Sequence, residues 1–439
     1  MTAQTVHIIG AGLAGCEAAW YLANRGVRVR LYEQKPQKKS PAHHADTFAE
    51  LVCSNSLKAK RINSAGGLLK AEMRLWSSLC LQAADTCQVP AGGALAVERT
   101  AFSAYITEKI LGHPAIEMVY GEQTEIPADG APVIVATGPL TSGALYDAIR
   151  QRCGDYLSFY DAAAPIGTAE SVDAAFSFAQ SRYADDEGDY VNCPLDKQQY
   201  EAFYQALVTA QAAPLHNFDR PVVYEGCMPI EIMARRGADT IRFGPMKPVG
   251  LRDPRTGKRP WAVLQLRREN EAGSLYNLVG FQTNLKFGEQ KRVFSMIPAL
   301  KNAEFVRYGV MHRNTFIDSP RVLSGSLQLR DGTPVWFAGQ ITGVEGYMES
   351  AASGIAVGVA VFRALHGLPA PKFPRETMLG ALLGYISDPS VKDFQPMGAN
   401  FGILPALDVK IRNKQERYMA LAQRALKQME HTKQSSDRV

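Results

Sequence analysis

The sequence predicts an α/β protein in which a Rossmann-type dinucleotide-binding domain is interrupted by an inserted α+β domain and followed by a small helical segment. Three observations carry this prediction. A glycine-rich turn separates two apolar strands near the N-terminus, a second strand with a glycine turn and a helix comes late in the chain, and a long stretch of mixed strand and helix character lies between them.

The first of these units reads as a strand, a turn, a helix and a second strand. The apolar run at residues 6–9 suits a buried parallel strand. A helix rich in Ala and Leu begins at Leu13 and ends at Gly26, and residues 27–32 form the second strand. This order is a βαβ unit.

The turn of this unit carries the pattern GxGxxG, formed by Gly10, Gly12 and Gly15, and Glu33 follows the second strand. The first glycine permits a tight turn, the second lets the backbone approach a pyrophosphate, and the third allows close packing of helix and strand. A carboxylate at the end of the second strand can accept hydrogen bonds from ribose hydroxyls. The pattern therefore predicts a dinucleotide site.

Two later segments indicate which dinucleotide is bound. Residues 131–142 form a buried strand that ends in ATG, and residues 333–365 form a strand, a glycine turn and a helix of small residues. This late return to the sheet resembles flavoproteins with two dinucleotide folds, so FAD is the expected cofactor and a permanently bound NAD is the alternative. The residues expected to contact the cofactor are Gly10, Ala11, Gly12, Leu13, Ala14, Gly15, Glu33, Thr137, Gly138, Gly339 and Gly346.

The domain organisation follows from these segments. We expect the FAD-binding domain at residues 1–154 and 321–370, with the inserted substrate or RNA domain at residues 155–320. Residues 371–439 form a C-terminal helical segment whose tail is expected to be disordered from Thr432 onward.

The insert mixes both kinds of secondary structure. Residues 200–211 predict a helix, and residues 260–267 and 275–285 predict strands. Between them, residues 224–260 are rich in Pro, Gly and Arg, which is typical of shaped loops around a site.

The seven cysteines are scattered, with no CxxC pair and no histidines at metal-ligand spacing. We therefore expect neither a disulfide framework nor a metal site. No apolar run of about 18 uncharged residues is present, and the N-terminus has no signal-peptide pattern. These features predict a cytoplasmic protein that does not cross a membrane.

Positive charge is concentrated in two regions, although the net charge is only +5. Residues 235–268 contain ten Lys or Arg against two Asp, and residues 408–439 contain eight against four acidic residues. A polyanion would bind such a surface, and an ordinary solvated face is the alternative. The candidate substrate contacts here are Arg235, Arg236, Arg252, Arg255 and Lys258.

Several further segments carry a family resemblance. They are GAGLAGCEAAW, CSNSLKAK, VPAGGALAVER, YEGCMPIEIMARRG, RFGPMKPVGL, YNLVGFQTNLKFGEQKRVF and RYGVMHRNTFI. Together they resemble the bacterial folate- and FAD-dependent tRNA (uracil-5-)-methyltransferases, of the flavoprotein superfamily that includes the wobble-uridine-modifying glucose-inhibited division protein A. The likeness extends from Val6 to about Leu407.

The resemblance implies conversion of uridine-54 in the tRNA T loop to 5-methyluridine. The carbon would come from 5,10-methylenetetrahydrofolate, and NAD(P)H would supply electrons through FAD. The same chemistry on a ribosomal RNA uridine, a small-molecule FAD/NAD(P)H oxidoreductase and a flavin-bearing RNA-binding scaffold are the alternatives. The oligomeric state and the preference for NADH or NADPH stay open.

The same resemblance implies that Cys53 and Cys227 are the two functional thiols. Carbon 5 of uracil is a poor nucleophile, and addition of a thiolate to carbon 6 activates it. Both cysteines have Lys or Arg nearby in sequence, which predicts a lowered thiol pKa. We expect Cys227 to attack the uracil and Cys53 to assist from the flavin domain, with a buried structural thiol as the alternative for each.

Two further side chains are candidates for the site. His312 can stack on a pterin or flavin or move a proton, and a structural histidine is the alternative. Arg99 can reach the cofactor pyrophosphate or form a surface ion pair.

Overall fold

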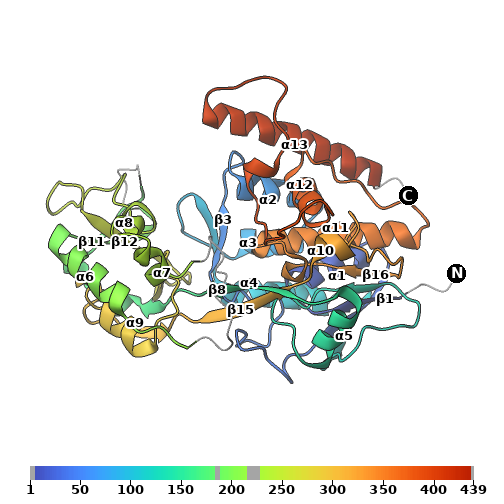
Figure 1. Ribbon diagram of the computed structural model, residues 1–439, viewed down its shortest axis with the longest axis horizontal. Helices are drawn as coiled ribbons and strands as arrows, with labels where there is room; N and C mark the ends of the chain where they lie inside the picture. The colour runs from blue at the N-terminus through green and yellow to red at the C-terminus, as the bar shows by residue number, and fades with distance from the viewer. Residues whose placement is uncertain (1–4, 183–187, 215–227, 437–439) are drawn as a thin grey trace.

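A computed structural model describes residues 5–182, 188–214 and 228–436 (Figure 1). The part that contains the N-terminus, here called the N-terminal part, also takes in later segments of the chain. It is built on a five-stranded parallel sheet with the strand order β16-β7-β1-β2-β6. These strands are β1 (Thr5–Ile9), β2 (Arg28–Glu33), β6 (Ile116–Tyr120), β7 (Val133–Val135) and β16 (Val335–Phe337). The predicted early, middle and late strands therefore lie in one sheet, and the α/β fold class is confirmed.

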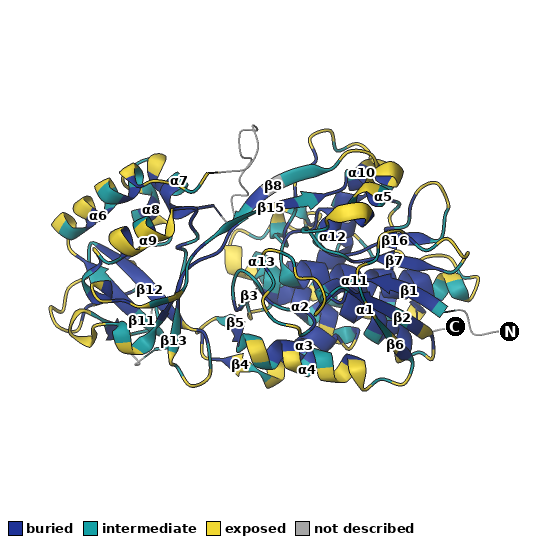
Figure 2. Ribbon diagram, turned by 90° about the horizontal axis from the view of Figure 1, so that it is seen from below, coloured by how far each residue is buried: buried dark blue, intermediate teal, exposed yellow. Residues whose placement is uncertain are grey.

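Helices α1 (Leu13–Ala23) and α11 (Tyr347–Leu365) pack directly against each other over this sheet (Figure 2). The contact requires a glycine, because a Cβ at Gly354 would lie 2.2 Å from the backbone oxygen of Ala14. Helix α11 is long and apolar enough to cross a membrane by length and composition. Most of it is buried inside the protein, as expected of a core helix.

Smaller elements complete the N-terminal part. A three-stranded antiparallel sheet contains β3 (Ser56–Ala59), β5 (Ala94–Val97) and β4 (Gln88–Val89). The surrounding helices are α2 (Ala65–Leu75), α3 (Leu79–Thr86), α4 (Arg99–Leu111) and α5 (Gly143–Cys153).

The insert has an antiparallel sheet of its own, with the strand order β10-β11-β12-β13-β9-β14. The strands are β9 (Ile166–Thr168), β10 (Phe178–Ala179), β11 (Tyr190–Leu195), β12 (Ala262–Arg268), β13 (Leu275–Leu278) and β14 (Phe305–Arg307). The helices are α6 (Lys197–Thr209), α7 (Ile230–Arg235), α8 (Thr240–Phe243) and α9 (Phe287–Phe294). The predicted helix and strands are present, but the strand expected over residues 275–285 ends at Leu278.

The insert and the N-terminal part have separate hydrophobic cores. They are joined by a two-stranded antiparallel ribbon of β8 (Leu157–Ala162) and β15 (Met311–Phe316), which crosses between them in Figure 1. The boundaries expected at residues 154 and 320 stay a prediction.

The C-terminal segment contains α12 (Met378–Ile386) and α13 (Lys414–Ser436), and the short α10 (Ser319–Val322) precedes β16. The tail expected to be disordered from Thr432 is instead helical as far as Ser436. The reason is burial, since Thr432 and Ser436 are buried and the indole nitrogen of Trp76 lies 3.2 Å from the Met429 sulfur.

Candidate active site

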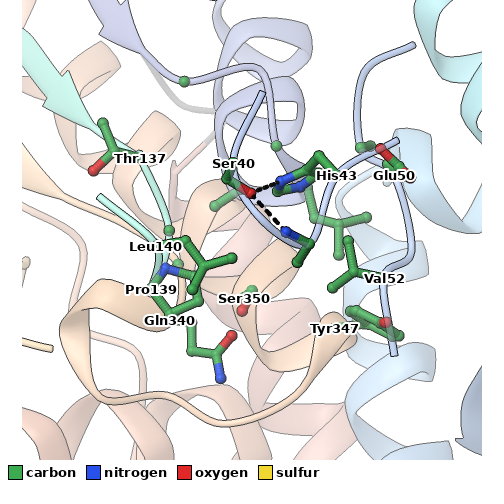
Figure 3. A pocket seen from close by; sticks show the side chains of 18 of the residues that line it. Ser40, His43, Glu50, Val52, Thr137, Pro139, Leu140, Gln340, Tyr347 and Ser350 are labelled. Carbon is green, nitrogen blue, oxygen red and sulfur yellow. Dashed lines mark hydrogen bonds between the residues drawn. The ribbon is translucent and has the colours of Figure 1, made fainter. Parts of the chain in front are cut away.

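A cavity of about 400 Å³ lies at the carboxyl ends of the parallel strands (Figure 3). This is the usual ligand position in open α/β sheets, and the volume falls within the range of small-molecule sites, about 300–1,000 Å³. Its wall includes the glycine turn after β1, the segment after β7 and the first turn of α11. It also includes Cys53 from the loop before β3.

The glycine turn has the geometry that a dinucleotide requires. Gly10 has a φ of +103°, and a Cβ there would lie 2.5 Å from the oxygen of Ala136. A Cβ at Gly15 would lie 1.9 Å from the oxygen of Gly10, so this glycine allows close packing of helix and strand. At Gly12 a Cβ would meet no atom within 4 Å, because this backbone faces the cavity.

Two helices begin at this cavity without a side-chain cap. Gly12 is the N-cap of α1 and Gly346 is the N-cap of α11. Uncapped amides and the positive end of the helix dipole suit an anionic group such as a pyrophosphate. The Glu33 carboxylate accepts hydrogen bonds from the amides of Ala11 and Lys35, both at 3.0 Å, and also faces the cavity. These features fit a bound dinucleotide.

Most residues expected to contact the cofactor line this cavity. They are Gly10, Ala11, Gly12, Leu13, Ala14, Glu33, Thr137, Gly138, Gly339 and Gly346. Gly15 does not line the cavity and contributes through packing. Direct contact with FAD stays a prediction for each of them.

Cys53 is held by Tyr347, the first residue of α11. The Tyr347 hydroxyl oxygen accepts hydrogen bonds from the amides of Cys53 at 2.8 Å and Ser54 at 3.3 Å, and lies 2.9 Å from the Cys53 sulfur. In this contact either the hydroxyl or the thiol can be the donor, but a Cys53 thiolate could only accept a hydrogen bond from the hydroxyl.

Three arginines fix the loop on either side of Cys53. Arg267 donates to the side chains of Asn55 at 2.9 Å and Ser54 at 3.1 Å. Arg307 donates to the oxygen of Val52, and Arg99 donates to the oxygen of Leu51 at 2.9 Å. Arg267 and Arg307 come from the insert, so this network joins the insert to the cavity wall.

A buried carboxylate balances part of this charge. Glu269 forms an ion pair with Arg99, and the two side chains are only 6% and 15% exposed. This result corrects both expectations for Arg99, because its guanidinium lies neither at the cavity nor in a surface pair. Burial raises the pKa of Glu269, while Arg99 and Arg267 lower it.

The prediction of a lowered thiol pKa is wrong for Cys53. Burial, followed by the charge of Asp161, raises the pKa of Cys53 to about 12. The nearby lysine in sequence does not counter this, because Lys58 forms an ion pair at 2.6 Å with Glu349. The thiol is therefore protonated at neutral pH.

Carboxylates gather at the same end of the cavity. Glu345 and Asp161 both line it, and Gln340 donates a hydrogen bond to Glu345. Burial and then Asp161 raise the pKa of Glu345 to about 8. Glu345 thus holds a proton through much of the neutral pH range.

His312 lies on the cavity wall, as a site residue should. Burial and the neighbouring Arg307 lower the pKa of the imidazole, so the neutral form dominates near pH 7. Its role in binding stays a prediction. Cys16, by contrast, is fully buried in the core.

Cys227 lies outside the described residues. The chain after it is anchored at the cavity, because the amide of Ile230 donates to the oxygen of Gln282 at 2.7 Å and Gln282 lines the cavity.

The five basic candidates of the insert are exposed and lie away from the cavity wall. They are Arg235, Arg236, Arg252, Arg255 and Lys258. Arg255 is partly neutralised by its ion pair at 2.6 Å with Asp253. Contact with RNA stays a prediction for this group.

Sequence reasoning missed Tyr347, Glu345 and two of the three arginines that hold the Cys53 loop, Arg267 and Arg307. Tyr347 and Glu345 belong to the late glycine turn. A polar side chain next to the start of a helix at a ligand site is a signal from which a site residue could have been predicted. For Arg267 and Arg307 the sequence carries no such signal.

Comparison with known proteins identifies the family. The profile described as Glucose inhibited division protein A matches residues 5–369. The protein named Methylenetetrahydrofolate--tRNA-(uracil-5-)-methyltransferase TrmFO from Listeria monocytogenes is 57% identical over 96% of this chain and 97% of its own length. The protein of the same name from Acetivibrio thermocellus is 56% identical over the same shares of the two chains.

Solved structures are similar in fold. The GidA structure of Aquifex aeolicus in crystal form II has a TM-score of 0.69 and 15% identity, and the match covers 98% of this chain and 73% of that one. The profile spans most of the chain, and the relatives are similar along nearly its whole length. The chain therefore belongs to the glucose-inhibited division protein A family.

Proposed function

We propose that this protein is a folate- and FAD-dependent RNA methyltransferase that makes 5-methyluridine at uridine-54 in the T loop of tRNA. The observation that carries the proposal is the meeting of a dinucleotide-type glycine turn and a cysteine, Cys53, in one cavity. Relatives at 57% identity are named methylenetetrahydrofolate--tRNA-(uracil-5-)-methyltransferase, which supports methylation of a tRNA uracil at carbon 5. The expected compartment is the cytoplasm, and the expected partner is the T arm of tRNA.

The residues at the cavity fit FAD as the bound cofactor. The first turns of α1 and α11 would face its anionic groups, and Glu33 would face a ribose. When bound, FAD supplies the hydride that completes the methyl group, with NAD(P)H as the source of electrons and 5,10-methylenetetrahydrofolate as the source of carbon.

The protein's own groups then have separate tasks. Cys227 is the proposed nucleophile toward carbon 6 of the uracil, because Ile230, three residues after it in sequence, is bonded to Gln282, which lines the cavity. Burial keeps Cys53 as a neutral thiol although its contact with Tyr347 lowers the pKa, so Cys53 is better suited to donate a proton than to attack. With these separate roles, only one of the two thiols adds to the uracil.

The decisive experiment measures nucleosides by mass spectrometry after incubation of the purified protein with unmodified tRNA or unmodified ribosomal RNA, together with methylenetetrahydrofolate and NADPH. We expect 5-methyluridine in tRNA only when both small molecules are present. 5-Methyluridine in ribosomal RNA instead of tRNA would identify ribosomal RNA as the target and leave the proposed chemistry unchanged. NADPH oxidation without any RNA product would support the small-molecule oxidoreductase.

The cysteine assignment is tested by replacing each thiol. We expect Cys227→Ala to abolish formation of the covalent complex with an RNA that carries 5-fluorouridine at the target, and Cys53→Ala to keep it. The opposite pattern would exchange the two roles.

A further inference from the structure

An exposed stack of aromatic rings lies at the edge of the insert. Phe287, the first residue of α9, is 54% exposed, and its ring stacks on Tyr308 with centroids 4.9 Å apart and planes at 16°. Tyr308 in turn contacts Phe305, which contacts the buried Phe294. The outer ring is therefore supported from below by rings that continue into the core of the insert.

This stack adjoins the cavity. The Gln290 side chain of α9 exchanges two hydrogen bonds of 2.8 Å with the backbone of Gly309, directly after Tyr308. A Cβ at Gly309 would lie 2.6 Å from the oxygen of Ala163, which lines the cavity. The segment then continues into β15, where His312 also lines the cavity.

The surroundings of the stack are basic. Residues 286–292 and 305–313 contain five Lys or Arg and one acidic residue, Glu289. Glu289 is already paired with Arg292 at 2.7 Å. Lys291 and Arg313 are exposed. An exposed ring among cations suits an RNA loop better than a neutral protein surface, because RNA offers both bases for stacking and phosphates for the cations.

We propose that the Phe287–Tyr308 stack is a platform on which an unpaired base of the substrate RNA loop stacks while the target uridine enters the cavity. The proposal rests on the proposed function and names the surface by which the RNA reaches the site. Extrusion of a base from a folded loop leaves its neighbours without stacking partners, and an exposed aromatic ring restores one.

The test is the affinity of the full-length protein for an unmodified tRNA transcript, measured by fluorescence anisotropy. Phe287→Ala is expected to weaken binding by about five- to a hundredfold, the loss typical of one base–aromatic contact. Phe287→Trp is expected to bind within about twofold of the wild type, because it keeps a stacking face. Leu111→Ala is the matched control, since Leu111 is 51% exposed on α4 of the N-terminal part.

Salt dependence separates stacking from charge. Phe287→Ala is expected to keep the wild-type slope of log affinity against log salt, whereas Lys291→Ala is expected to reduce the slope by about one. Flavin content and melting temperature, measured on each variant, show whether the fold is intact.

Each alternative result has its own meaning. Wild-type affinity in a correctly folded Phe287→Ala variant would overturn the platform while leaving the proposed function intact. The platform would also be overturned if the variant changes only the oligomeric state in light scattering, because the ring would then contact a second copy of the chain. Failure of the wild type to bind or methylate tRNA would count against the proposed function itself.

Discussion

The Tyr347 hydroxyl oxygen lies 2.9 Å from the Cys53 sulfur and accepts a hydrogen bond from the Cys53 amide at 2.8 Å, although the two residues are 294 positions apart. One phenol thus fixes both the backbone and the thiol of the candidate site. Since a thiolate accepts a hydrogen bond from the hydroxyl, Tyr347 would stabilise the thiolate that burial disfavours. The state of this thiol is therefore set by tertiary structure.

The first prediction concerns the pH dependence of Cys53 alkylation. Only the thiolate reacts, and burial raises the pKa of Cys53 to about 12. The rate of modification by iodoacetamide, measured by peptide mass spectrometry, should therefore rise about tenfold per pH unit up to at least about pH 10. A thiol of ordinary pKa, about 8.5, would level off near pH 9.5.

A matched variant checks the cause. Tyr347→Phe removes the hydrogen-bond donor to the sulfur, so Cys53 alkylation at pH 9 should become slower than in the wild type. Faster alkylation would mean that Tyr347 shields the thiol from the reagent and does not stabilise its anion.

The second prediction concerns the buried ion pair beside this loop. Glu269→Gln would leave Arg99 without its carboxylate partner, with the buried Arg267 and the half-buried Arg307 nearby. Loss of one partner of a buried pair typically costs about 3–5 kcal/mol of unfolding free energy. Urea denaturation should show a loss of this size if the protein unfolds in a single transition.

The control for this variant is an exposed pair. Arg30 and Glu117 are 3.0 Å apart, with side chains 41% and 59% exposed. Because solvent screens such a pair, Glu117→Gln should leave the denaturation midpoint unchanged. Equal effects of the two substitutions would show that Glu269 is not a buried counterion.

The glycine turn was predictable from sequence because its geometry is local. Gly10, Gly12 and Gly15 fall within six positions, and the backbone of one βαβ unit fixes their places. The Cys53 environment was not predictable in the same way. Its lysine neighbour in sequence, Lys58, turns to Glu349, while the groups that set its pKa come from β8 and α11.

The same limit applies to the end of the chain. A polar sequence after Thr432 predicted disorder, but α13 continues to Ser436, and both Thr432 and Ser436 are buried in the folded protein. The local sequence pattern indicates only how readily a segment forms a helix, and tertiary contacts determine whether the helix is present in the folded protein.

The third prediction separates two glycines of the same turn. Gly15→Ala would place a Cβ 1.9 Å from the oxygen of Gly10, so we expect a large loss of melting temperature or no folded protein. Gly12→Ala meets no atom within 4 Å and should fold normally, yet it should bind FAD at least about tenfold more weakly, because its methyl group enters the path of the pyrophosphate. Melting curves and flavin fluorescence titration measure the two effects. Unchanged FAD affinity in Gly12→Ala would place the cofactor away from this turn.

The last prediction concerns Glu345 and the pH dependence of stability. Burial and Asp161 raise the pKa of Glu345 to about 8, and Lys58 and Gln340 only partly oppose this. The folded protein then binds the Glu345 proton more tightly than the unfolded chain, whose glutamate pKa is about 4.3. Its contribution to stability is full below about pH 4.3 and is lost as the pH rises through 8.

Glu345→Gln removes this titration and keeps a side chain of similar size. The unfolding free energy of the wild type, relative to the variant, should therefore fall between about pH 5 and pH 9, by up to about 1.4 kcal/mol per pH unit. Taking the difference cancels other raised groups such as Glu72, whose pKa is also raised by burial to about 8. Urea denaturation of the wild type and the variant, both without cofactor, measures this difference in unfolding free energy. A constant difference across this range would mean that Glu345 is ionised in the folded protein and that burial does not raise its pKa.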